Sequence, residues 1–326
     1  MPAFYHYIPA QGISCPQKHN LFRHWLYLIP PKNVADLKIR VLYILCLLLL
    51  ATPSRGQQAR QYSFTHFGVT TGLASNETTT CIQDEQGFIW IGTNRGLQRF
   101  DGQRYLTFVH QKNNPGSVPQ NYIVQTLLDK KKNLWILTGD GKVGVFDTKW
   151  FVYREVPVKV KNPKVLLIER ELVEDEQGNL MIIFHNNEFV TWDPATKEFS
   201  AKHNFIPIPG NWAFVDLVQQ PGTKKYWIGR REGLAVYNQA TGKMSYWGHN
   251  VENEPIIEKW GKVPVPNFLL FDKHGRLWFD TWLGAPTIFA YDMKKNEPVL
   301  DRYDLASLLE GYHETNGFLE RKDGSI

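Results

Sequence analysis

Short runs of alternating apolar and polar residues fill most of the chain from residue 78 onward, and turn residues separate them. In the first such stretch, residues 78–83, 88–93, 97–100 and 104–109 are predicted strands. An Asp-x-x-Gly turn joins the first pair and an Asp-Gly turn joins the last pair, both of which suit hairpins. The pattern therefore predicts a four-stranded antiparallel unit whose Trp, Ile, Phe and Thr residues favour a half-buried pleated surface.

This unit recurs along the chain at a nearly constant spacing. An aromatic or Met anchor follows each first turn, and the anchors are spaced by 45, 46, 46 and 51 residues. The anchors are Trp90, Trp135, Met181, Trp227 and Trp278. A second landmark, an aromatic followed by Asp or Asn, comes 10 to 13 residues after each anchor. We therefore predict an all-β fold, a β-propeller of four-stranded antiparallel blades that is incomplete, with about five blades plus the start of a sixth. A two-sheet sandwich would have no reason to repeat a Trp at the same position of successive units.

The first unit resembles a known repeat. Residues 71–76, the block Asp84–Thr93 and residues 96–102 are similar to the two-component regulator propeller repeat. That repeat builds the periplasmic sensor regions of Bacteroidetes-type sensor histidine kinases, including hybrid ones, and the resemblance extends over about residues 61–326. It implies a ligand-sensing propeller for an oligosaccharide or other small ligand, and a homodimer in the full-length parent. Signals would then pass through a transmembrane helix to a cytoplasmic kinase.

The last residues repeat the first turn. Gly324 stands where each repeat has the Gly three residues before its anchor, so a sixth anchor is expected at position 327. We therefore expect the chain to be a fragment, truncated before the transmembrane and kinase parts that the resemblance implies. On this interpretation the chain itself is not an enzyme, since its parent's kinase activity belongs to those parts.

The N-terminal region differs from the rest in composition. An apolar run of 11 residues from Val41 to Ala51 follows Lys38 and Arg40, the pattern of a secretory signal peptide. We assign residues 37–56 to this signal, 1–36 to a non-native or disordered extension, and 57–326 to the partial propeller, exported to the periplasmic side of the inner membrane. Residues 1–56 hold six of the 37 Lys and Arg but one of the 32 acids, so residues 57–326 have no net charge. This balance argues against a nucleic-acid partner, and membrane contact is expected only through the missing helix.

Candidate chemistry within the propeller is sparse. Residues 139–144 match G-x-G-x-x-G, but a strand pattern follows where a dinucleotide site needs a helix, so we predict a hairpin turn. No His or Cys pair has metal-ligand spacing, and we expect neither a metal nor a cofactor. Glu171, Glu174 and Asp175 are the carboxylates that could be proposed for catalysis, with Asp175 already used as a turn residue. An acid–base pair at the propeller axis would favour an enzyme such as a lyase or glycosidase.

A binding face can be predicted from the loops. Short turns share one face, whereas longer, irregular segments such as residues 249–267 share the other, where function is usual. The candidate ligand-binding residues on that second face are Trp212, Trp260, Trp282, Arg95, Arg230 and Arg231. The Trp rings could stack on sugars, pack over blade cores or contact another propeller, and the Arg residues could equally be solvated hairpin charges. A free periplasmic propeller that acts as a scaffold for protein partners is the alternative function.

Overall fold

The computed structural model describes residues 65–162, 164, 170–186, 188–281, 287–304, 317–321 and 323–326, together with residues 5, 6 and 42. The predicted extension and signal peptide therefore lie almost wholly outside the described residues. Within the described ranges, no helix has the length and apolar character that a bilayer-crossing segment needs. The chain divides into two units, and in the unit Ala3–Phe67 strand β1 (Tyr5–His6) pairs antiparallel with β2 (Thr65–His66).

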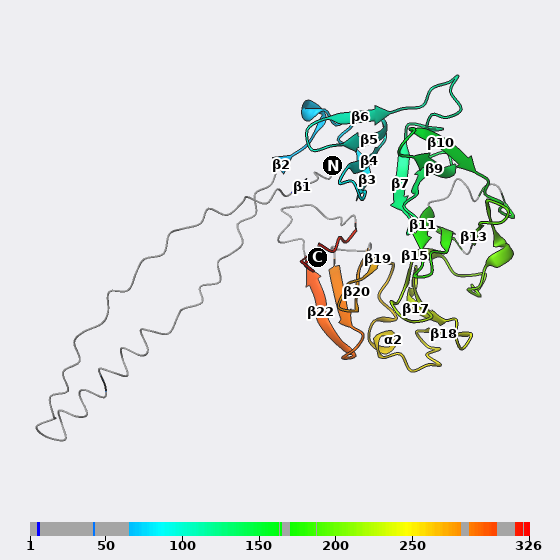
Figure 1. The fold of residues 1–326 in the computed structure, drawn as a ribbon. Helices are drawn as coiled ribbons and strands as arrows, with labels where there is room; N and C mark the ends of the chain where they lie inside the picture. The colour runs from blue at the N-terminus through cyan, green and yellow to red at the C-terminus, as the bar shows by residue number, and fades with distance from the viewer. Residues whose placement is uncertain are drawn as a thin grey trace, which may run out of the picture. The chain divides into compact units, whose positions relative to one another are not determined.

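The other unit, which includes Gly68–Ile326, contains five four-stranded antiparallel sheets whose strands follow one another in chain order (Figure 1). Blade 1 consists of β3 (Thr78–Gln83), β4 (Ile89–Thr93), β5 (Gly96–Phe100) and β6 (Tyr105–Phe108). Blade 2 consists of β7 (Ile123–Leu128), β8 (Leu134–Thr138), β9 (Val143–Asp147) and β10 (Val152–Val156). Blade 3 consists of β11 (Arg170–Glu174), β12 (Leu180–Phe184), β13 (Phe189–Asp193) and β14 (Glu198–Ser200).

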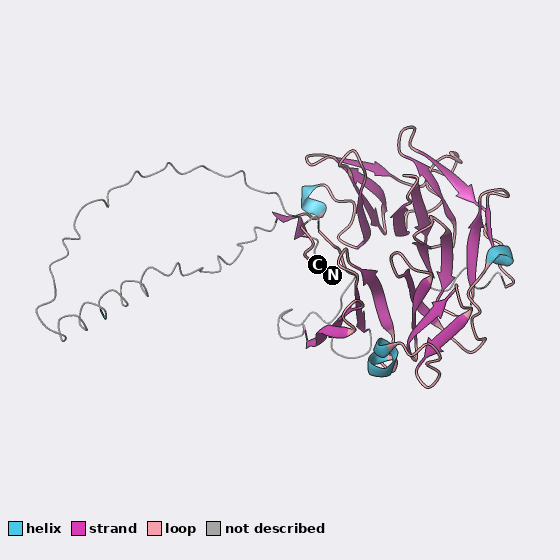
Figure 2. Cartoon of the chain, turned by 60° about the horizontal axis from the view of Figure 1, so that its bottom comes forward, coloured by secondary structure: helices cyan, strands magenta, loops and turns pink. Residues whose placement is uncertain are grey.

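Blades 4 and 5 complete the series. Blade 4 consists of β15 (Phe214–Gln219), β16 (Lys225–Arg230), β17 (Gly233–Asn238) and β18 (Lys243–Tyr246). Blade 5 consists of β19 (Pro266–Phe271), β20 (Arg276–Thr281), β21 (Thr287–Asp292) and β22 (Glu297–Asp304). Helical segments lie outside the sheets: η1 (Val69–Thr71), η3 (Ala201–His203) and α2 (Pro255–Trp260) (Figure 2). The all-β prediction is confirmed, and the strands predicted for blade 1 differ from the observed ones by one residue at most at either end.

The first strands of consecutive blades lie side by side, as the blades of a propeller do around an axis. Buried apolar clusters fill the space between one blade and the next. Trp90 and Leu97 of blade 1 pack on Ile136 of blade 2, and Trp227 of blade 4 packs with Phe279 of blade 5. The stability of the array therefore depends on contacts between neighbouring blades, as in other repeat proteins.

The repeated Asp and Trp form one structural unit in the first turn of a blade. Asp84 accepts the backbone N–H groups of Gln86 and Phe88 with Oδ1, both at 3.0 Å, and the indole Nε1–H of Trp90 with Oδ2 at 2.8 Å. The same indole bond joins Asp129 to Trp135 and Asp272 to Trp278, each at 2.9 Å. The Asp and the anchor recur together because the carboxylate ties the turn to the second strand.

Blade 3 departs from this rule. Met181 replaces the anchor Trp and has no N–H to donate, and the Tyr226 hydroxyl of the next blade donates to Asp175 Oδ2 instead, at 3.1 Å. The turn carboxylate of blade 3 therefore also holds blade 4 in place.

A sixth turn of the same geometry lies at the end of the chain. The N–H of Arg321 donates to the carbonyl of Ser325 and that of Gly324 to the carbonyl of Arg321, both at 2.8 Å. The Asp84 turn has the same two bonds, at 2.9 and 3.1 Å. Glu320 also accepts the N–H of Lys273 from blade 5, at 2.9 Å. These contacts form the turn that the start of a sixth blade was predicted to have, and no strand is described after β22.

The G-x-G-x-x-G segment forms a hairpin, as predicted. Gly141 has a φ of 93° in the turn between β8 and β9, and its N–H donates to the carbonyl of Thr138 at 3.0 Å. Strand β9 then follows, so no helix N-terminus is available there for a pyrophosphate.

Candidate ligand-binding site

Two of the candidate ligand-binding Trp residues, Trp212 and Trp260, are buried. Trp212 is 7% exposed and belongs to the apolar cluster between blades 3 and 4. Trp260, at 4%, belongs to the cluster between blades 4 and 5, where its ring packs against Phe279 at 5.7 Å and Phe289 at 5.1 Å. Both residues pack over blade cores, which was one of the alternatives open to them. Their large apolar rings gain more by filling these gaps than by facing solvent.

The structure brings Trp212 and Arg230 together. The guanidinium of Arg230 lies 4.2 Å from the centre of the Trp212 ring and 5.2 Å from that of Tyr246. Burial lowers the pKa of Arg230, although its Nη1 is 3.2 Å from a carboxylate oxygen of Glu232. Arg230 is therefore a stacked, largely buried side chain and not a charge on a hairpin surface.

The other three candidate residues do not join this group. Arg95 and Arg231 are exposed, in the second-to-third-strand turns of blades 1 and 4. Trp282 lies outside the described residues. Ligand contact by these residues stays a prediction.

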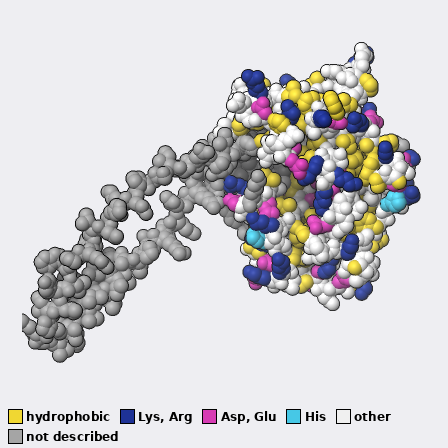
Figure 3. Space-filling view, viewed as in Figure 1, with side chains coloured by type: hydrophobic (Ala, Val, Ile, Leu, Met, Phe, Trp, Pro, Cys, Tyr) yellow, Lys and Arg dark blue, Asp and Glu magenta, His cyan; other side chains and the backbone are white. Residues whose placement is uncertain are grey.

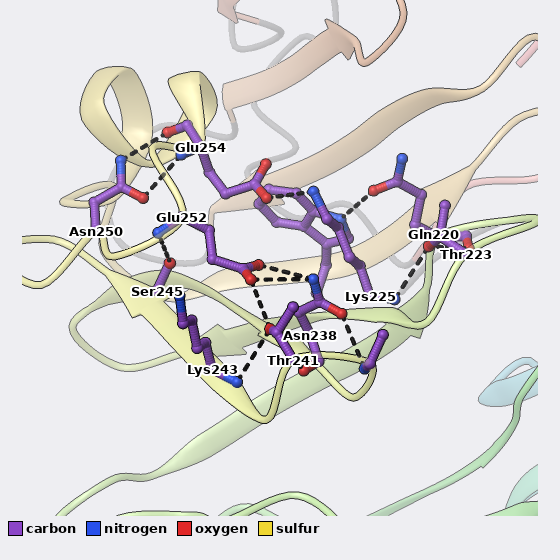
Figure 4. Close-up of polar contacts among 12 residues, drawn as sticks. Gln220, Thr223, Lys225, Asn238, Thr241, Lys243, Ser245, Asn250, Glu252 and Glu254 are labelled. Atoms are coloured by element: carbon purple, nitrogen blue, oxygen red, sulfur yellow. Dashed lines mark hydrogen bonds and ion pairs between the residues drawn. The ribbon is translucent and has the colours of Figure 1, made fainter.

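The irregular segment 249–267 is fastened to blade 4, and only part of it lies on the predicted face. Figure 4 shows Glu252 accepting from Asn238 and Thr241, at 2.9 and 2.6 Å, and Glu254 paired with Lys225. Asn238 and Thr241 belong to a short turn on the opposite face. Helix α2 follows directly and carries Trp260 into the space between blades 4 and 5. This segment is therefore a wedge between blades, which its sequence did not reveal.

A cleft of about 420 Å³ opens between blades 3 and 4. Its lining comes from the short turns, from strand residues next to them, and from η3 with the link that follows it: Gln177, Asn179, Thr191, Trp192, Asp193, Pro194, His203, Phe205, Lys224, Tyr226 and Gln239. The cleft thus lies on the short-turn face, opposite the face that the loop lengths predicted. Its volume is within the range of small-molecule sites.

The walls of the cleft differ in character. Phe205 stacks obliquely on Tyr226, with ring centres 4.9 Å apart, and these two rings form the aromatic part of the lining. The ring of Trp192 is engaged with Trp135 of blade 2, at 5.3 Å, so it adds less to the cleft than its type suggests. Three polar residues of the lining, Gln177, Lys224 and Gln239, are exposed to solvent. Their amide and ammonium groups are therefore accessible for hydrogen bonds to a ligand.

Asp193 is the one carboxylate in the lining. Its Oδ1 accepts the N–H of Ala195 at 2.9 Å, and this bond, with the His203 ring 3.1 Å from Oδ2, lowers the pKa of Asp193 to about 2. The group is therefore ionised at every physiological pH and suits recognition of hydroxyl groups better than proton transfer. Sequence reasoning missed the cleft because Asp193 was identified only as a turn residue.

A pair of carboxyl groups does lie on the inner strands. Glu171 of β11 is hydrogen-bonded to Asp216 of β15, and Asp216 is 5% exposed. The two oxygens of Asp216 accept the N–H groups of Leu217 and Leu269, at 2.6 and 2.5 Å. Because both oxygens already bind backbone donors of two blades, this pair links blades and lacks the free base that catalysis on a substrate needs.

Charged side chains of both signs are interspersed over the face seen in Figure 3, in keeping with the absence of net charge beyond residue 56. Among the described residues, no group of three or more His, Cys, Asp or Glu side chains is arranged to hold a metal ion.

Comparison with known proteins identifies the repeat. Residues 72–95, which include β3 and β4, match the family described as the two component regulator propeller. This segment is a two-component regulator propeller repeat. Blades 2 and 5 share the Asp–Trp bond of its turn, as Asp129–Trp135 and Asp272–Trp278 show. No curated protein matches the chain.

Solved structures share the fold. The chain is similar to the extracellular domain assigned to the hybrid two-component system BT3049 of B. thetaiotaomicron, with a TM-score of 0.56 and 19% identity over 72% of this chain and 31% of that one. It is also similar to PorZ, an essential surface component of the type-IX secretion system of Porphyromonas gingivalis, with a TM-score of 0.52 and 14% identity over 74% and 36% of the two chains. The chain spans about a third of the length of each structure. At these identities the likeness shows the propeller fold.

Proposed function

We propose that this chain is the extracytoplasmic ligand-sensing propeller of a two-component sensor histidine kinase. The regulator propeller repeat at residues 72–95 supports this assignment, and so does the fold shared with the extracellular domain assigned to BT3049. The signal-peptide pattern of residues 37–56 supports export to the periplasmic side of the membrane. In this proposal the propeller binds and does no chemistry, while phosphoryl transfer belongs to a cytoplasmic kinase of the parent protein.

The cleft between blades 3 and 4 carries the proposal for a ligand. It combines a half-buried aromatic ring, Phe205, with the amides of Gln177 and Gln239 and the ionised carboxylate of Asp193. An aromatic face suits the C–H face of a sugar ring, and amides with a carboxylate suit its hydroxyl groups. We therefore assign the ligand as a neutral mono- or disaccharide unit of an oligosaccharide.

Calorimetric titration of the chain with a panel of neutral disaccharides and trisaccharides tests the ligand. We expect binding by at least one member, weakened about tenfold or more in Phe205→Ala and Gln239→Ala, because each removes a group from the cleft. Trp150→Ala is the matched control, since this aromatic also lies on the short-turn face but is 69% exposed and outside the cleft. Equal losses in the control and the cleft variants, or no binding by the panel, would contradict the assignment.

A second function is favoured by the likeness to PorZ. A propeller of this kind could serve as a scaffold that binds other proteins of a surface assembly instead of a sugar. Cross-linking in the native membrane separates the two proposals. A sensor is expected to cross-link to a second copy of itself, as a homodimer, whereas a scaffold is expected to cross-link to other envelope proteins.

A further inference from the structure

One column of positions on the inner strands joins each blade to the next. This position lies four residues before the turn Asp of a blade. In blades 1 and 2, whose turn residues are Asp84 and Asp129, it holds Thr80 and Gln125. The Thr80 hydroxyl oxygen accepts the N–H of Thr126 at 3.3 Å and is 2.9 Å from that residue's hydroxyl. Gln125 accepts the N–H of Leu172 at 2.7 Å and donates to its carbonyl at 2.9 Å. Neutral side chains therefore connect blades 1 to 2 and 2 to 3.

The same column holds two carboxyl groups in blades 3 and 4. Asp216 repeats the pattern, because its Oδ2 accepts the N–H of Leu269 in blade 5. Glu171 does not reach the equivalent N–H of blade 4, which belongs to Leu217 and is bound by Asp216 Oδ1 at 2.6 Å. Glu171 is instead hydrogen-bonded to the carboxyl group of Asp216. Blades 3, 4 and 5 are thus joined through a carboxyl–carboxyl contact where the earlier blades use neutral groups.

A contact between two carboxyl groups requires a proton. Since both oxygens of Asp216 accept backbone N–H groups, Asp216 is best satisfied as the carboxylate, and Glu171 must supply the donor. Burial, reinforced by the charge of Asp216, raises the pKa of Glu171 well above its usual range, which agrees with this placement. Glu171 is half-buried, so its proton can exchange with solvent.

No cation among the described residues neutralises the pair. The cations on the strands packed around it are engaged elsewhere: Arg170 with the Thr138 carbonyl, Arg230 with Glu232, Arg276 with Asp272 and Lys225 with Glu254. Strands β7, β12 and β19 carry no charged residue. The titratable group that does face the pair is Asp280 of β20, 2% exposed, with no hydrogen-bond partner for its Oδ1 in the described structure. Burial, reinforced by the charge of Asp216, raises the pKa of Asp280 to about 7, so this carboxyl group also ionises as the pH rises. Its negative charge would add to the repulsion.

We propose that Glu171 and Asp216 form a proton-dependent latch between blades 3, 4 and 5, closed while Glu171 carries its proton and loosened when it ionises. Ionisation places the half-buried carboxylate of Glu171 against the buried carboxylate of Asp216, near Asp280, and removes the donor that joined them. A group whose folded-state pKa is raised destabilises the fold as the pH rises from the unfolded value toward the folded one. The latch therefore weakens toward alkaline pH, and it makes the geometry of these blades respond to pH whether or not a ligand binds.

Amide hydrogen exchange of the full chain between pH 6 and 9 tests the latch, after correction for the intrinsic base-catalysed rate. We expect the protection factors of Leu217 and Leu269 to fall at least about tenfold, the ratio that one unit of pKa shift produces. The amides of Thr126 and Leu172, bound by neutral side chains in the same column, are internal controls and should keep their protection. A parallel loss at all four amides would overturn the proposal, because it would report general loosening.

Two variants make the test independent of fold stability. Glu171→Gln keeps a donor and copies Gln125, so Leu217 and Leu269 should stay protected at every pH in the range. Gln125→Glu should transfer pH dependence to Leu172. If Glu171→Gln retains the wild-type pH dependence, the latch does not exist. Should Gln125→Glu fail to fold, the Glu171→Gln result alone decides.

Discussion

The hydrogen bond between Asp129 and Trp135 gives the sharpest test of why the repeat has its sequence. Asp129 is 4% exposed and accepts three donors: the backbone N–H of Asn133 at 2.7 Å, its side-chain amide at 2.8 Å, and the indole of Trp135 at 2.9 Å. In Asp129→Ala, water can take the place of the carboxylate as the hydrogen-bond acceptor for the backbone and side-chain N–H groups of Asn133, because this residue is exposed. It cannot do so for the indole, because Trp135 is 3% exposed.

The magnitude follows from these differences. An unsatisfied buried donor costs about 1–3 kcal/mol, and the lost bonds to a charged acceptor add to it, so Asp129→Ala should lower the free energy of unfolding by about 2–4 kcal/mol. Trp135→Phe should cost about 1–3 kcal/mol by itself. Once Phe is present no donor is left orphaned, so the double variant should be more stable than the sum predicts, with a coupling energy of about 1.5–3 kcal/mol.

Urea denaturation followed by circular dichroism measures these free energies for the four members of the cycle. Met181 offers a matched control, because Met181→Leu changes the anchor of a blade that has no indole bond and should show no coupling with Asp129→Ala. Strictly additive costs for Asp129→Ala and Trp135→Phe would refute the reasoning. The repeated Asp and Trp would then owe their recurrence to separate roles.

Three further predictions concern stability and fold. The Ala195 N–H is the main cause of the depressed pKa of Asp193, so the carboxylate stabilises the fold above about pH 4 and this stabilisation is lost as the pH falls toward 2. In acid unfolding, Asp193→Asn should therefore lose less stability than the wild type between about pH 4 and 2. Trp260→Ala should lower the free energy of unfolding by about 3–5 kcal/mol by leaving a cavity between blades 4 and 5, as measured by urea denaturation. Gly233→Ala should expose the segment bearing α2 to limited proteolysis, since φ is 129° there and a Cβ would meet the carbonyl oxygen of Gly261 at 1.9 Å; unchanged digestion would contradict this.

The blades could be predicted from sequence because their information is local and repeated. The turn Asp, its Gly and the anchor Trp interact within seven residues, so one pattern fixes the hairpin and the register of its strands. The anchors Trp90, Trp135 and Trp278, each bound to its turn Asp, are therefore found at equivalent places in the structure. Even blade 3, where Met181 breaks the pattern, keeps its strands because Asp175 still closes the turn.

The segments outside the repeat could not be placed in this way. Trp212 and Trp260 belong to links whose path depends on gaps between blades, and those gaps exist only once the blades are packed. The cleft was missed for the same reason, since its lining comes from two blades. The contact between Glu171 and Asp216 did leave a signal, because an alignment of the repeats puts them in one column with Thr80 and Gln125.

The most direct test of the proposed function is a hydrogen-exchange footprint of the chain with a neutral oligosaccharide that binds it. The cleft assignment predicts added protection confined to the turns and link of blades 3 and 4, at residues 175–179, 193–205 and 223–240. The exposed residue Arg95 in blade 1 should show no change. Protection on the opposite face, or no protection with any oligosaccharide tested, would contradict the proposal that this propeller senses its ligand in the cleft.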